Sequence, residues 1–92
     1  MKLGDTMKEA IELLGGDRMD SYGDPKKLCE HAARIATAVT GIQLSAVDVV
    51  DVMIAVKFAR EKNAHKFDNC VDLCGYAEIR NYIKENENEQ SN

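Results

Sequence analysis

Two consecutive helical segments of this chain carry charged residues on faces that are otherwise apolar. At about 100° per residue, Lys57 and Arg60 share one arc of their helix with its apolar side chains. Asp72 lies in the same way on the apolar arc of the next helix. Burying a charge is costly unless the charge is paired or meets a charged ligand. We therefore expect these three side chains to face one another, an anion, or both.

Apolar periodicity and helix-end signals predict an all-α bundle of about four helices. The expected ranges are 6–14, 25–40, 45–62 and 68–84. Few aromatic residues, one Pro and no Trp also favour helices over a sheet. Residues 17–24, between the first two helices, lack a helical period and predict a loop.

Capping residues predict where these helices begin. Thr6 with Glu9 forms the pattern of a capping box, as does Ser45 with an acid three residues later. Asp24 followed by Pro25 predicts a cap and a first helical residue, and Gly41 predicts the end of that helix. Asp68 is the expected cap of the last helix.

Two helix interiors predict how the bundle packs. The third helix is apolar nearly all round, which indicates a central position. Gly75 lies inside the fourth helix at a cost of about 1 kcal/mol relative to Ala. We therefore expect a neighbouring helix or a ligand to approach the backbone of Gly75 closely.

The length of 92 residues supports one domain, expected over residues 1–84, with residues 85–92 as a disordered acidic tail. So short a chain buries only a modest core, which favours a homo-oligomer. The net charge of −4 argues against a DNA or RNA surface. Without a membrane span or signal peptide, we expect a cytoplasmic protein with free thiols at Cys29, Cys70 and Cys74.

Several blocks occur together in a recognisable order. They are Gly16-Asp17-Arg18, Ser21-Tyr22-Gly23-Asp24-Pro25, Asp48, Lys57-x-x-Arg60 and Asp68-x-x-x-Asp72-x-x-Gly75-Tyr76-Ala77. The chain thereby resembles a family of small all-helical domains of unknown function encoded by phages and prophages. The resemblance implies a phage origin and a nucleotide-related role. Two positions depart from the family pattern, which has an aromatic residue near Cys70 and an apolar residue near Asp51.

The charged residues form a candidate ligand site. Lys57 and Arg60 lie one turn apart and suit a phosphate or carboxylate, and Asp68 and Asp72 follow on the next helix. Arg18 and Tyr22 on the loop, and Tyr76 one turn after Asp72, complete the set. Cations for phosphate, rings for base stacking and carboxylates for hydroxyl or amino groups are suited to a nucleotide.

Each of these residues also has a purely structural interpretation. Lys57 and Arg60 can pair with Asp72 and Asp68 across the two helices. Arg18 can be a solvated charge and Tyr22 a plug in the loop. In that case the buried charges only fix the register of a structural or protein-binding module.

A metal site is the alternative. Nucleotide pyrophosphohydrolases of the MazG type hold Mg²⁺ with acids on two successive helices. The nearest equivalents here are Asp48-x-x-Asp51 and Asp68-x-x-x-Asp72, with Asp48, Asp68 and Asp72 as the candidate ligands. Cys70 and Cys74 lie one turn apart, but two thiols without a nearby His or Cys pair make a poor zinc site, and His65 is expected in solvent. No nucleophile beside a base and no phosphate-binding loop is visible.

These observations favour a phage-encoded, non-catalytic binding protein without a cofactor. Its expected partner is a small phosphorylated ligand of nucleotide type, such as a signal of host antiviral defence that the protein sequesters. The alternative is a Mg²⁺-dependent, all-α nucleoside triphosphate pyrophosphohydrolase of the MazG type.

Overall fold

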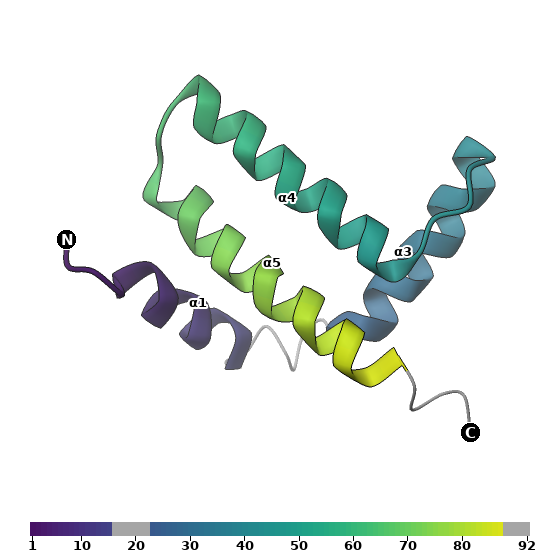
Figure 1. Ribbon diagram of the computed structural model, residues 1–92, viewed down its shortest axis with the longest axis horizontal. Coiled ribbons are helices and arrows are strands. Elements are labelled where there is room, and N and C mark those ends of the chain that lie inside the picture. The colour runs from purple at the N-terminus through teal and green to yellow at the C-terminus, as the bar shows by residue number, and fades with distance from the viewer. Residues whose placement is uncertain (16–22, 88–92) are drawn as a thin grey trace.

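The computed structural model describes residues 1–15 and 23–87, and these residues form four helices, whereas the predicted loop at 17–24 lies mostly outside the described residues. The helices are α1 (Asp5–Gly15), α3 (Pro25–Thr40), α4 (Ala46–Asn63) and α5 (Phe67–Asn86) (Figure 1). The prediction of an all-α fold with four helices is therefore confirmed. None of the helices in the described part of the chain is long and apolar enough to cross a membrane.

The ends of α3 and the start of α4 follow the predicted local signals. The side chain of Asp24 accepts a hydrogen bond from the backbone N–H of Lys26 at 2.9 Å, and Gly41 ends α3 with a φ of 75°. Before α4, Ser45 Oγ accepts from the N–H of Asp48 at 3.1 Å, and Asp48 Oδ2 accepts from the N–H of Ser45 at 2.9 Å. The reciprocal capping box is thus confirmed.

The starts of α1 and α5 differ from the prediction. Helix α1 begins at Asp5, whose carboxylate accepts from the N–H of Lys2, so Thr6 lies inside the helix and does not cap it. Helix α5 begins at Phe67, which leaves Asp68 in the first turn rather than at the cap. Asp68 still favours the start of α5 because a negative charge interacts well with the positive end of the helix dipole.

Helix α5, not α4, holds the central place in this structure. It lies between α1 and α4, runs antiparallel to α4, and also contacts α3 (Figure 1). Among the described helices, α4 packs against α3 and α5 alone, and part of its apolar surface is exposed: Val52 is 57% exposed and Phe58 60%. The all-round apolar character of α4 was therefore misleading about its burial.

A small core joins α4 to α5 near the C-terminal end of α5. Val47, Val50 and Ile83 are buried together, with Tyr76 and Ile79 packed against them. Lys26 ties the start of α3 to the same end, since its buried ammonium donates to the carbonyl of Asn86 at 2.9 Å. A cation is favourable there because the last carbonyls of a helix carry partial negative charge. Helix α5 runs two residues beyond its predicted end, while residues 88–92 lie outside the described part.

Candidate functional site

A cavity of about 510 Å³ lies among the four helices. Its lining comes from all of them and includes Leu14 of α1, Leu28 and Ala32 of α3, Val49 and Met53 of α4, and Ile79 of α5. This volume is within the range of small-molecule sites, which are mostly apolar with a few placed polar groups. The helices that build the fold therefore also enclose a space of ligand size.

Asp72 and Tyr76 bring a carboxylate and a phenol to the cavity wall. The carboxylate is held from outside, because Lys57 Nζ lies 2.7 Å from Asp72 Oδ2. The side chain of Lys57 is only 12% exposed and that of Asp72 28%, so the pair is largely shielded from water. The expectation that these two charges face each other is confirmed.

The lining also contains an ionisable thiol, that of Cys29. Burial raises its pKa above the usual value, because an apolar environment disfavours the thiolate. Cys29 is therefore a neutral thiol at pH 7 and behaves as a small apolar side chain. Among the described lining residues, Asp72 is therefore the charged group.

Gly75 lies between Asp72 and Tyr76 on the cavity side of α5. Among the described residues, a Cβ atom built there would meet no heavy atom within 4 Å outside the local helix. The expected close approach of a neighbouring helix is therefore absent, and Gly75 opens onto the cavity that it lines. Its missing side chain adds to the space among the helices.

Arg60 and Asp68 do not reach this cavity. Arg60 is exposed and lines a second hollow toward the C-terminal end of α4, together with Lys66 and Asn69. Asp68 is exposed at the start of α5 and does not pair with Arg60. Of the predicted ligand residues, the structure brings together Lys57, Asp72 and Tyr76. Arg18 and Tyr22 lie outside the described residues.

The structure separates Asp48 from the other two acids of the alternative Mg²⁺ site. Asp48 is engaged in the cap at the start of α4, and Asp68 lies at the start of the antiparallel α5. With a rise of 1.5 Å per residue along α4, these positions are separated by about 20 Å. Asp72 is paired with Lys57. Asp48 therefore cannot share one metal ion with Asp68 and Asp72, which lie one turn apart on α5.

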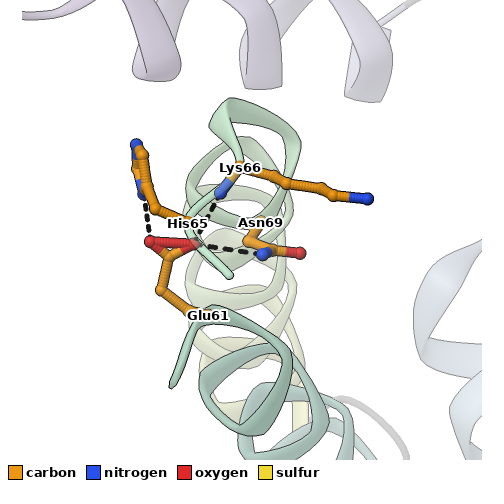
Figure 2. Close-up of polar contacts among 4 residues, drawn as sticks. All are labelled: Glu61, His65, Lys66 and Asn69. Carbon is orange, nitrogen blue, oxygen red and sulfur yellow. Dashed lines mark hydrogen bonds and ion pairs between the residues drawn. The ribbon is translucent and has the colours of Figure 1, made fainter. Parts of the chain in front are cut away.

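A polar network that sequence reasoning missed connects the end of α4 to the start of α5. Glu61 Oε1 accepts from the backbone N–H of Lys66 at 3.0 Å and from Asn69 Nδ2 at 3.1 Å, while Oε2 contacts His65 Nδ1 (Figure 2). The bonds from His65, Lys66 and Asn69, in that order of effect, lower the pKa of Glu61 to about 2. Glu61, rather than Asp68, therefore satisfies the donors at this junction. The spacing Glu-x-x-x-His was the available signal.

A second missed contact lies on the surface of the same helix pair. Arg80 Nε of α5 donates to Asp51 Oδ1 of α4 at 2.7 Å, and Nη2 lies 3.4 Å from Oδ2. The guanidinium lowers the pKa of Asp51 by hydrogen bonding first and by charge second. The acid that departs from the family pattern thus has a partner on the neighbouring helix.

This geometry defines a small all-helical domain with a ligand-sized, mainly apolar cavity beside an ion pair. The chain belongs to the family described as a domain of unknown function (DUF6378), which matches residues 5–84. It is similar to the Gene 55 protein of Mycobacterium phage L5, with 36% identity over 72 residues, and to the Gene 55 protein of Mycobacterium phage D29, with 32% identity over 72 residues.

These matches cover 76% and 77% of this chain, but 46% and 48% of the L5 and D29 proteins, respectively. The chain thus spans about half the length of these curated relatives. No solved structure matches it significantly. The resemblance to a phage family of unknown function is confirmed.

Proposed function

We propose that this phage-family protein is a non-catalytic binding protein for a small nucleotide-type ligand, whose base enters the cavity among the four helices. The observation that carries the proposal is the carboxylate of Asp72 on an otherwise mainly apolar wall. Lys57 occupies Oδ2, while Oδ1 has no hydrogen-bond partner among the described residues. A flat ring with N–H donors suits this wall, because the ring fills apolar space and its donors meet the free oxygen.

Tyr76 supports the same ligand class. Its ring lines the cavity one turn after Asp72, where a stacked base would gain contact energy. Since the described residues of the cavity lining include no cation, the phosphates would remain at the mouth. The loop residues Arg18 and Tyr22 are our candidates for meeting them there, as predicted from the sequence.

Sequestration of a host immune signal is the role that agrees best with both the cavity and the membership of a phage family. A sponge needs affinity and no turnover, and the described site has no nucleophile beside a base. The predicted Mg²⁺ acids are engaged elsewhere or lie far apart. We therefore place the protein in the host cytoplasm, where such nucleotide signals are made.

The test is a binding panel followed by native mass spectrometry. Nucleoside mono- and triphosphates and cyclic dinucleotides are screened by thermal shift, and a bound ligand is then released by denaturation and weighed. We expect at least one nucleotide to raise Tm and to be recovered intact. Recovery of a cleaved product would identify an enzyme instead, and the absence of any shift across the panel would refute nucleotide binding.

Two variants locate the site. Gly75→Leu fills the cavity and Asp72→Asn removes its charge, so both should weaken binding of the nucleotide found in the panel. Asp68→Asn is the matched control, because Asp68 lies one turn earlier on α5 but is exposed and outside the cavity lining. Unchanged affinity in Gly75→Leu would move the ligand to another surface.

We also propose that the chain forms a homo-oligomer. Ile35 and Val39 lie one turn apart on α3 and are 53% and 79% exposed, and α4 also carries exposed apolar side chains, among them Val52 and Phe58. Burying such side chains between subunits would supply apolar contact that a short chain lacks. Light scattering should give a mass above 10.2 kDa. A monomer at every concentration would refute this.

A further inference from the structure

Three metal-ligating side chains meet at the junction between α4 and α5. They are Glu61 in the last turn of α4, His65 in the connector and Cys70 in the first turns of α5. One ligand atom of each lies within 4.8 Å of the other two. In the described part of the chain, this is the one group of three such residues.

The donor set is one that zinc accepts. Zn²⁺ is bound by thiolate at about 2.3 Å and by imidazole or carboxylate at about 2.1 Å, so ligand atoms around a tetrahedral ion lie roughly 3.5 Å apart. The present separations therefore need only small side-chain rotations. A sulfur ligand also distinguishes this set from the oxygen sites of Mg²⁺ and Ca²⁺.

Groups around the cluster already orient its carboxylate. The backbone N–H of Lys66 and the amide of Asn69 hold Glu61 Oε1, so Oε2 is the oxygen on the side of His65 (Figure 2). Asn69 is buried and fixes this arrangement. Hydrogen bonds of this kind orient the ligands of metal sites and raise their affinity.

Cys70 is the residue that the polar network alone does not explain. Glu61 and His65 lie four residues apart and could pair for stability, but the half-buried thiol of Cys70 forms no hydrogen bond with any described residue. It nevertheless lies beside the pair, on a different helix from Glu61. A metal would give all three side chains a common partner.

We propose that Glu61, His65 and Cys70 bind one Zn²⁺ ion that fastens the α4–α5 junction and keeps a fourth position for water or a partner ligand. Thiolate and carboxylate together balance the two charges of the ion. On binding, the thiol proton of Cys70 passes to solvent and its sulfur becomes the metal ligand. Affinity should therefore rise with pH.

Cobalt substitution tests the site directly. The purified protein is titrated with Co²⁺ and then with Zn²⁺, and a thiolate-to-cobalt charge-transfer absorption reports sulfur ligation. We expect one equivalent of Co²⁺ to produce this absorption and Zn²⁺ to displace it. Binding without the absorption, or no binding, would overturn the proposal.

Matched variants assign the ligands. Cys70→Ser should abolish the absorption, whereas Cys74→Ser, one turn further along α5, should retain it. His65 is 74% exposed, so His65→Gln leaves the helices folded by circular dichroism and should weaken Zn²⁺ affinity by about 10-fold or more. His31→Gln is its control. Equal Zn²⁺ affinity in His65→Gln and the unaltered protein would overturn the assignment.

Discussion

The cavity and the α4–α5 junction place charge in opposite ways. In the cavity, Asp72 is the charged group of an apolar wall, and its pairing with Lys57 is mostly shielded from water. At the junction, the carboxylate of Glu61 is about as exposed as that of Asp72, but it accepts from several donors, and its ionic partner His65 is 74% exposed where Lys57 is 12% exposed. Electrostatic interactions strengthen as water is removed. A change at the cavity should thus cost more stability than a similar change at the junction.

The largest effect should follow from leaving one charge of the cavity pair alone. Lys57→Ala strands the carboxylate of Asp72, and we expect a loss of about 2 kcal/mol, below the value for a fully buried pair because Asp72 is 28% exposed. Urea denaturation followed by circular dichroism measures it. The double variant Lys57→Met with Asp72→Leu should recover most of the loss. If the double variant is less stable than Lys57→Ala, the pair stabilises the fold more than apolar contact would.

A substitution of Gly75, which lines the same cavity, should increase the stability of the protein. Gly75→Ala should stabilise the protein by about 1 kcal/mol, because Ala is the better helix former and the cavity gives its methyl group space. Thermal and urea denaturation check this. Ala77→Gly, at an exposed position of the same helix, should cost a similar amount and serves as the reverse control. Destabilisation by Gly75→Ala would mean that this space is filled.

The ion pair of Lys57 with Asp72 and the open space at Gly75 show how far the sequence could predict the candidate site. The pairing of Lys57 with Asp72 was predictable because helical periodicity alone places both charges on inner faces. The open space at Gly75 was not predictable, since it depends on how far apart the neighbouring helices pack. The same limit applies to Arg60, which shares an arc with Lys57 but lies beyond the cavity, at the end of α4.

Helix ends also divide into those that local sequence signals predict and those that depend on the fold. The caps of α3 and α4 were predicted correctly because Asp24 and Ser45 bond to residues two or three positions away. The start of α5 was not, because its donors are satisfied by Glu61 of the preceding helix, which only the folded turn brings near. The cluster of Glu61, His65 and Cys70 was missed for this reason too. Interactions within one helical turn can be predicted from the sequence, whereas interactions across a connector can be identified only from the folded structure.

At the α4–α5 junction, a substitution of Glu61 should change how the stability of the protein depends on pH. The pKa of Glu61 is lowered to about 2 in the folded protein, so its stabilising effect is complete above its unfolded value of 4.5 and is lost as pH falls toward 2. Glu61→Gln keeps an acceptor for Lys66 and Asn69 but cannot titrate. Its Tm should therefore fall less than that of the unaltered protein between pH 5 and 2. If the Tm of both proteins falls equally between pH 5 and 2, protonation of Glu61 is not the cause of the lost stability.

The smallest effect should come from the surface pair of Asp51 and Arg80. This pair tests whether exposure or contact geometry determines how much an ion pair contributes to stability. The Asp51 carboxylate has two contacts to its guanidinium, a better geometry than the single contact of Lys57, yet both side chains are 45% exposed. Exposed pairs contribute little and are screened by salt. Asp51→Asn should lower Tm less than Lys57→Ala, and the difference from the unaltered protein should vanish in about 1 M salt. A loss equal to that of Lys57→Ala, persisting in salt, would show that contact geometry outweighs burial in this fold.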